Sequence, residues 1–425
     1  MAGYRRRNIW WCALCVVLLA AGCGSQAART QQPARTQRAA AEAPSGASPR
    51  TSPGGGVWLG SLQMNSARTG WALRWTVSPW GTQAGYLAPA RTTDGARTWT
   101  DVTPPTAAAL LKTPDATPVL DALDGNRAWL AVTAAPRETI SPHLTVVFGT
   151  SDGGRTWTGS APFKVPAPAR LLSFAGPDDG WLLASYGGTM GQDPVWLYRT
   201  TDAGLRWSLI TATPPSGTGS NGPPVECDKA GLAFATAQAG WLTSFCTGES
   251  PDVLLVTRDG GARWAPQALP IPTSAFCRSG CEVYNPPQFF GRTGFVVIGD
   301  GPGAPYFLAS RDLGETWAPE PLPSGAGVYP RITFFSPLDG VLVSAGPSGA
   351  IGGIFDTTAD GGTTWTAVPQ GRSFTANGTE FDFVSPRTGF AWVLGADAPA
   401  GPPAMDQTTD SGRTWTVFTP VLADG

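Results

Sequence analysis

The stretch Thr150-Ser-Asp-Gly-Gly-Arg-Thr-Trp157 decides the fold, because the chain carries seven variants of this octet. Every copy has Asp at its third position and Trp at its eighth. Successive copies lie 48 to 58 residues apart, with their acidic residues at Asp94, Asp152, Asp202, Asp259, Asp312, Asp360 and Asp410. A fixed period of this length indicates an array in which each repeat is one supersecondary unit.

A second pattern precedes each octet. It consists of an aromatic or large apolar residue, a polar turn, and then Gly or Ala followed by Trp, Phe or Val. Phe174 with Trp181 and Phe234 with Trp241 are seven residues apart, and we expect a turn one residue shorter at 123–129 and 289–295. Each unit therefore predicts four short strands. In the third unit they are expected at 170–174, 181–185, 195–200 and 207–210.

Seven such units predict an all-β fold, a seven-bladed β-propeller of four-stranded antiparallel blades. The octet is expected to form the turn between the third and fourth strands of each blade. The composition agrees, because 54 Gly and 41 Pro among 425 residues disfavour long helices, and 42% hydrophobic residues suffice for a core. Residues 57–425 are the expected propeller domain.

Residues 1–22 are predicted to be a lipoprotein signal peptide. Arg5, Arg6 and Arg7 precede the apolar run 9–21, which is too short to cross a bilayer as a helix. The end of this run resembles the bacterial lipobox, in which Cys23 is lipidated, although Ala20 stands where Leu is more frequent. An ordinary secretory signal with an incidental Cys23 is the alternative. Residues 23–56, rich in Ala, Pro, Ser and Arg, are expected to form a flexible tether.

These features predict a bacterial cell-envelope protein. It would be exported and held by lipid in the outer leaflet of the plasma membrane or in an outer membrane. A formal charge of -2 shows no nucleic-acid footprint. His143 is the single histidine, which excludes metal sites built from several histidines and disfavours a histidine-dependent triad. No cofactor, metal site or catalytic residue is predicted.

Four cysteines follow the tether, and export favours disulfides over thiol chemistry or zinc. Cys227 and Cys246 lie at matching distances from the turn at 234–239, so they should face each other across paired strands. That leaves Cys277 to pair with Cys281, and the other connectivities stay open.

The octet resembles the Asp-box, or bacterial neuraminidase repeat, with the pattern Ser/Thr-x-Asp-x-Gly-x-Thr-Trp. Ala96, Arg206 and Arg263 depart from this pattern. The whole array resembles Asp-box propellers of the photosystem II stability/assembly factor type, which are protein-binding scaffolds. The physical role of the seven Asp residues is to hold their turns, so none of them is expected to be catalytic.

Three functional classes follow. The leading interpretation is a lipid-anchored scaffold that binds or assembles a protein partner. The first alternative is a carbohydrate-active hydrolase of the sialidase or xyloglucanase type, since the same repeat occurs in both and a glycan would then be the ligand. The sialidase type is disfavoured because this chain lacks the early Arg-Ile-Pro signature of sialidases. Its most similar string, Pro330-Arg331-Ile332, has the three residues in a different order. The second alternative is a passive structural protein of the envelope.

Charged residues near the starts of the inner strands supply a candidate binding site. They should line a polar mouth of the central channel on the face opposite the octets, and Glu380 and Asp382 should share one face because they alternate with phenylalanines. The competing interpretation is ion pairing between blades, such as Arg331 with Glu380. The candidate charges are Arg170, Glu226, Lys229, Arg331, Glu380 and Asp382, with Tyr284, Tyr306 and Tyr329 on the rim.

Lipidation gives the first test. Metabolic labelling with palmitate should mark the wild type and spare the Cys23→Ser variant, because the thiol is the acylated group. Equal labelling of the two proteins would contradict a lipobox at this position.

Overall fold

The structure is a computed structural model. It describes residues 57–76, 85–113, 115–134, 142–188, 191–216, 221–246, 253–271, 281–283, 285–299, 305–323, 326, 330–344, 354–370, 374, 379–393 and 404–423. The expected signal peptide, Cys23 and the tether lie outside these residues. Among the residues described, no helix has the length and apolar character needed to cross a membrane.

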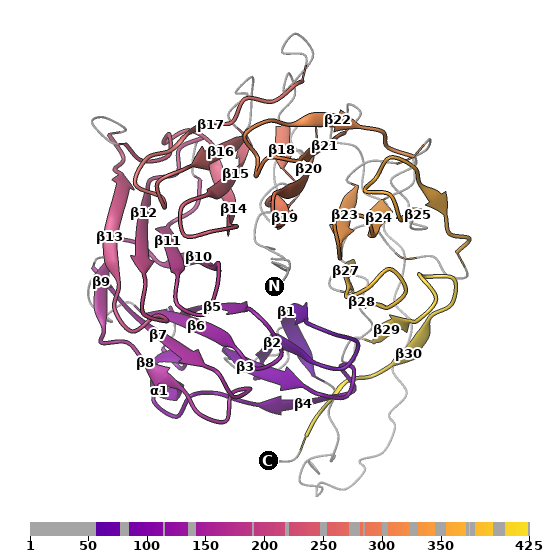
Figure 1. Cartoon of the computed structure of the whole chain (residues 1–425). Helices are drawn as coiled ribbons and strands as arrows, with labels where there is room; N and C mark the ends of the chain where they lie inside the picture. Colours follow the sequence, from indigo (N-terminus) through magenta and orange to yellow (C-terminus); the bar gives the residue numbers. More distant parts are fainter. Residues whose placement is uncertain are drawn as a thin grey trace, which may run out of the picture.

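The chain forms a seven-bladed β-propeller of four-stranded antiparallel blades, arranged as a ring in Figure 1. The first strand of each blade lies nearest the central axis and the fourth lies at the rim (Figure 1). The first three blades contain β1 (Trp58–Met64), β2 (Gly70–Trp75), β3 (Leu87–Thr92) and β4 (Thr98–Asp101); β5 (Thr117–Ala122), β6 (Ala128–Ala134), β7 (His143–Thr150) and β8 (Thr158–Gly159); and β10 (Ala169–Phe174), β11 (Gly180–Ser185), β12 (Val195–Thr200) and β13 (Ser208–Thr213). The short helix α1 (Ala108–Leu111) precedes the second blade, and β9 (Phe163–Val165) pairs with β7.

The remaining four blades repeat this order. They contain β14 (Asp228–Phe234), β15 (Gly240–Cys246), β16 (Leu254–Thr257) and β17 (Ala265–Pro266); β18 (Cys281–Val283) with β19 (Gln288–Phe290), then β20 (Thr293–Gly299), β21 (Tyr306–Ser310) and β22 (Ala318–Glu320); β23 (Arg331–Phe334), β24 (Gly340–Ser344), β25 (Ile354–Thr358) and β26 (Thr366–Ala367); and β27 (Thr379–Phe383), β28 (Gly389–Val393), β29 (Met405–Thr408) and β30 (Thr416–Phe418).

All seven octets form the expected turn between the third and fourth strands. In the second blade, the Thr150 hydroxyl donates to Asp152 at 2.9 Å, and the Asp152 carboxylate accepts the Thr156 amide at 2.9 Å and the Thr156 hydroxyl at 2.6 Å. Gly153 and Gly154 have φ values of 78° and 82°, which glycine tolerates without a steric penalty. The aspartates therefore hold the turns, as their place in the repeat predicts.

Aromatic stacking joins neighbouring blades. The Trp181 ring of β11 stacks on Phe234 of β14 with 3.6 Å between centroids and an interplanar angle of 1°. Equivalent stacks join Trp129 to Phe174, Trp241 to Phe289 and Phe295 to Phe334. The apolar core is accordingly a series of clusters between blades, with residues of β10 and β11 packed against residues of β14, β15 and β16 in one of them.

The expected shortened turns are correct in blade five and wrong in blade two. In blade five, Phe289 pairs with Gly294 and the turn is one residue shorter. In blade two, Ala122 pairs with Ala128 just as Phe174 pairs with Gly180, so Ala122 and not Leu123 occupies the position of the aromatic residue. Leu123 begins a turn of the usual length, and its large side chain gave the misleading signal.

The C-terminal strand closes the ring. β31 (Val421–Leu422) pairs with β4 in parallel and adds a fifth strand to blade one. The Val57 amide donates to the Pro420 carbonyl at 3.0 Å, and the Val421 amide donates to the Arg97 carbonyl at 3.0 Å. Figure 1 shows this last segment, in yellow, passing from the seventh blade to the outer edge of the first.

The stacked pairs generate a prediction about stability. Phe234→Ala should lower the free energy of unfolding by about 3–5 kcal/mol, because it removes a fully buried ring and leaves a cavity between blades three and four. Leu209→Ala, at a side chain that is 52% exposed, should change it by less than about 0.5 kcal/mol. Denaturant unfolding measures both, and similar losses in the two variants would show that the stack is not a main support.

Candidate binding site in the central channel

A buried ionic network joins the inner strands of blades three and four. The Arg170 guanidinium lies 2.9 Å from Asp228 and 3.7 Å from Asp193. The Lys229 amide donates to Asp193 at 2.9 Å, and the Lys229 ammonium donates to the carbonyls of Glu226 at 2.5 Å and Cys227 at 2.6 Å. Ser185 donates a further hydrogen bond to the Asp193 carboxylate.

Lys229 is fully buried, which corrects its expected place on an open channel mouth. Burial lowers the pKa of its ammonium to about 8, although the negative charges of Asp193, Asp228 and Glu226 act to raise it. The sequence placed Arg170 and Lys229 in one region, and the structure does bring them together. Through Asp193 and Asp228, Arg170 and Lys229 connect blades three and four. Glu226, by contrast, is exposed.

Glu380 and Asp382 share one face of β27, as expected, but both are buried and neither is open to a partner. The Asp382 carboxylate accepts the Met64 amide of blade one at 2.6 Å. Within the described part of the chain, neither carboxylate oxygen of Glu380 has a hydrogen-bond partner. Burial raises the pKa of Glu380 to about 8; the charge of Arg331 opposes this shift and that of Asp382 adds to it.

The expected tyrosine rim needs a correction at Tyr306. This residue begins β21, the third strand of blade five, and packs partly buried against the core between blades four and five. It therefore lies two strands away from the channel. Tyr284 and Tyr329 lie outside the described residues.

A chain of side-chain hydrogen bonds, which we call amide links, runs around the channel. In each link, a side chain accepts the backbone amide of the residue at the aromatic position of the next blade's inner strand. The accepting residue immediately precedes the aromatic position of its own inner strand. The five links join Gln63 to Ala122 (3.0 Å), Asp121 to Phe174 (2.9 Å), Ser173 to Phe234 (3.3 Å), Gln288 to Phe334 (2.8 Å) and Asp382 to Met64 (2.6 Å). Ala233 and Thr333 occupy the two other positions of this register.

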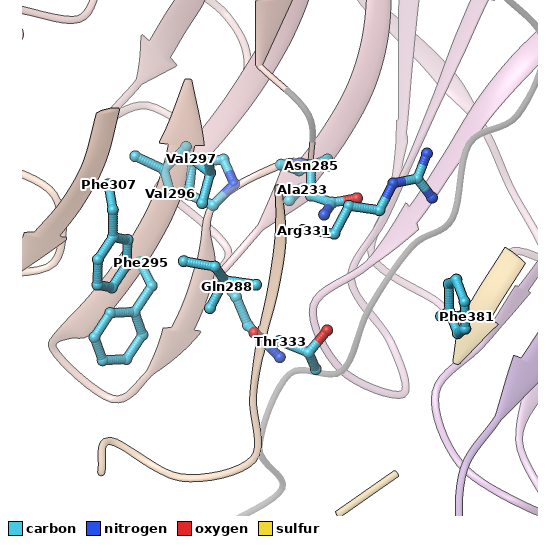
Figure 2. Close-up of a pocket in the computed structure, with 13 residues that line it drawn as sticks. Ala233, Asn285, Gln288, Phe295, Val296, Val297, Phe307, Arg331, Thr333 and Phe381 are labelled. Atoms are coloured by element: carbon cyan, nitrogen blue, oxygen red, sulfur yellow. The ribbon is translucent and has the colours of Figure 1, made fainter. Parts of the chain in front are cut away.

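A pocket of about 60 Å³ lies in the channel beside these two positions. Its lining comes from the fourth to the seventh blades and comprises Ala233, Asn285, Pro286, Pro287, Gln288, Phe295, Val296, Val297, Phe307, Arg331, Ile332, Thr333 and Phe381. Figure 2 shows the blade-five side chains on one side and Phe381 on the other, with the Arg331 guanidinium extending away from Phe295. Among the predicted site residues that the structure describes, Arg331 alone lines the pocket.

An interruption of the inner strand of blade five shapes this pocket. β18 pairs with β20 through Val283 and Ile298, and β19 pairs with the other end of β20. Between them lie Pro286 and Pro287, which lack the amide hydrogen that a continuous strand would need. β18 also pairs with β15, so blades four and five form one continuous sheet.

Cys227 and the backbones of Cys246 and Cys281 lie at this junction. Cys227 is disulfide-bonded. Asp228 pairs with Phe245, so the next residues along the two strands are Cys227 and Cys246. On its other side, the backbone of Cys246 pairs with that of Cys281. The side chains of Cys246 and Cys281, and the whole of Cys277, lie outside the described residues, so the pairs Cys227–Cys246 and Cys277–Cys281 stay predictions.

The remaining pocket residues were not predicted from the sequence. A signal was present, because the residue before the aromatic position is polar in six of the seven blades and is alanine only in blade four, at Ala233. No group of three or more His, Cys, Asp or Glu side chains in the described part of the chain is placed to hold a metal ion.

Comparisons with known proteins agree with the fold. No protein-family model matches the chain. A xyloglucanase from a Paenibacillus species is 25% identical over 309 residues, which are 66% of this chain and 29% of that protein. The chain therefore spans less than a third of the length of this relative.

Solved structures of several functions share the architecture. A prolyl endopeptidase structure has a TM-score of 0.50 and 9% identity, covering 86% of this chain and 50% of that one. A structure of YCF48 bound to a D1 peptide has a TM-score of 0.46 and 17% identity, covering 87% of this chain and 94% of that one. At these identities the similarity concerns the fold.

Glu380 generates a prediction about pH. Its pKa is about 8 when folded and 4.5 without the protein environment, so the folded state binds the extra proton between these values. The contribution of Glu380 to stability should be fully present below about pH 4.5 and should be lost as pH rises toward 8, by at most about 1.4 kcal/mol per unit. Glu380→Gln should flatten this dependence and be the more stable protein at pH 8.

Urea unfolding at several pH values measures the effect. Glu315→Gln is the matched control, because the Glu315 side chain is 64% exposed. If Glu380→Gln left the dependence of stability on pH unchanged, the raised pKa of Glu380 would be contradicted.

Proposed function

We propose that this protein is an exported, lipid-anchored β-propeller that binds a protein partner at its central channel and acts as an assembly scaffold. The observation that carries the proposal is the chemistry of the pocket lining. It offers apolar and aromatic contacts together with the guanidinium of Arg331 and the amides of Asn285 and Gln288. These groups suit recognition of a polypeptide, which presents apolar side chains and hydrogen-bond acceptors together.

The described lining favours binding over acid–base catalysis. The thirteen lining residues that the structure describes include no Asp, Glu, His, Cys, Lys, Ser or Tyr. A glycoside hydrolase of the usual kind needs two carboxyl groups about 5–9.5 Å apart. Near the channel, Asp121 and Asp382 instead hold backbone amides of neighbouring blades.

A glycoside hydrolase is the second candidate. Its specific support is the 25% identity with a xyloglucanase. The match covers 29% of that protein, and a shared propeller repeat is sufficient to explain this degree of sequence similarity. A passive structural protein is the third candidate, and it predicts neither a partner nor a reaction.

Photo-crosslinking in the native envelope tests the proposal. A photoreactive residue at position 331 should capture a discrete membrane-associated protein, whereas the same residue at exposed position 208 on β13 should not. Purified protein should release no sugar from xyloglucan or sialosides. Specific sugar release would establish the hydrolase, and neither crosslink nor hydrolysis would favour the passive role.

A further inference from the structure

The channel pocket has a buried apolar floor and a half-buried polar mouth. Seven of its thirteen lining residues are buried, and all seven are apolar. They include Ala233, Phe295, Val296 and Val297, which are at most 6% exposed. The polar lining residues are all half-buried, namely Asn285, Gln288, Arg331 and Thr333. Polar groups therefore lie at the entrance, whereas the described floor is made of apolar groups.

Two of the polar groups at the mouth are already engaged within the chain. The Gln288 side chain accepts from the Phe334 amide and donates to the Phe334 carbonyl, each at 2.8 Å. Arg331 has an interaction of its own in the structure, and its charge also acts on the buried Glu380. Selection of a ligand therefore falls to the floor. A polar group placed there would lose its hydrogen bonds to water and meet apolar side chains, so the occupant should be apolar.

The size of the pocket limits the occupant to one side chain. Its volume is about 60 Å³, and one water-sized site occupies roughly 10–15 Å³ on this scale. The space therefore corresponds to roughly four to six such sites. The branched aliphatic side chain of leucine or isoleucine matches this space. The methyl group of alanine would leave most of it empty, and the phenyl ring of phenylalanine would exceed it.

The position of the pocket favours a segment of another protein over a second folded copy of this chain. Ala233, Gln288, Ile332 and Phe381 place it among the inner strands of four blades, which lie nearest the central axis (Figure 1). A stable interface between two folded proteins takes about 800 Å² from each of them, and a recess one side chain wide does not offer that area. An extended or looped segment can enter the channel and insert a single side chain.

We propose that the pocket receives one leucine or isoleucine side chain from an extended segment of the partner. This side chain lies on the floor against Ala233 and Val297, between Phe295 and Phe381, which stand on opposite sides of the pocket (Figure 2). The polar backbone of the segment stays at the half-buried mouth. This inference rests on the proposed scaffold function and adds the chemistry by which the partner is selected.

Three blocked tripeptides serve as probes: acetyl-Ala-Leu-Ala-amide, its polar counterpart acetyl-Ala-Asn-Ala-amide, and the larger acetyl-Ala-Phe-Ala-amide. They are titrated into the full chain, purified in detergent and labelled with ¹⁵N at its 18 phenylalanines. The Leu peptide should move the amide signals of Phe295 and Phe381, which line the pocket, and leave those of Phe148 and Phe174 in place. The Asn peptide has nearly the same shape and should bind at least about tenfold more weakly, because its side chain gains nothing from apolar burial. The Phe peptide should also bind more weakly than the Leu peptide.

Two variants change the pocket, and two matched controls change the core elsewhere. Ala233→Val fills part of the floor, so it should weaken the Leu peptide several-fold, whereas Ala90→Val, at a fully buried alanine of β3, should leave the affinity unchanged. Val297→Ala enlarges the pocket, so the Phe peptide should then bind at least as tightly as the Leu peptide. Val147→Ala, at a valine of β7 that is 1% exposed, should also lower the thermal midpoint but keep the preference for Leu.

Equal affinity for the Leu and Asn peptides, or an unchanged affinity for the Leu peptide in Ala233→Val, would overturn this inference. A partner that is captured in the envelope equally well by the wild type and by Ala233→Val would also overturn it, while leaving the scaffold function intact. Leu-selective binding without any captured partner would support the pocket chemistry and count against the scaffold.

Discussion

The interface between neighbouring blades is the constraint on which the whole structure depends. A single four-stranded blade buries neither of its faces, so each face must find a neighbour. Three devices repeat at these interfaces: the stacked aromatic pair, the amide link, and the Asp-held octet turn. Trp181 illustrates how they cooperate, since its ring stacks on Phe234 while its indole nitrogen donates to the Gly260 carbonyl of the next octet at 2.8 Å.

The interface between blades four and five departs from this scheme. It keeps the stack of Trp241 on Phe289 but lacks the amide link, and β18 instead continues the sheet from β15 to β20. A backbone connection thus replaces the side-chain connection. The interrupted inner strand and the small Ala233 side chain then leave the space that forms the pocket. The place where the repeat is least regular is accordingly the place where we propose that a partner binds.

The fold could be predicted from the sequence because the repeat is local. Each octet makes its turn through bonds between residues two to four positions apart, as Thr150, Asp152 and Thr156 do, so the pattern is readable in eight letters. Blade number and strand order follow from counting. The error at Leu123 arose because Ala122 carries no large side chain to mark its position.

The site was harder to predict because it depends on contacts between blades about 50 residues apart. Charge alone suggested that Lys229, Glu380 and Asp382 reach an open channel mouth, yet Lys229 and Asp382 bond to backbone groups and all three are buried. Nothing in the composition distinguishes a buried charge held by carbonyls from one that reaches solvent. Arg331 was found because it begins an inner strand, and it does line the pocket.

Amide links hold most blade interfaces and are missing beside the pocket. Amide hydrogen exchange of the ¹⁵N-phenylalanine protein without ligand tests it most directly, because all five relevant phenylalanines are at most 3% exposed. The account predicts slow exchange at Phe174, Phe234 and Phe334, whose amides are linked, and markedly faster exchange at Phe289 and Phe383. Equal protection at all five amides would contradict it.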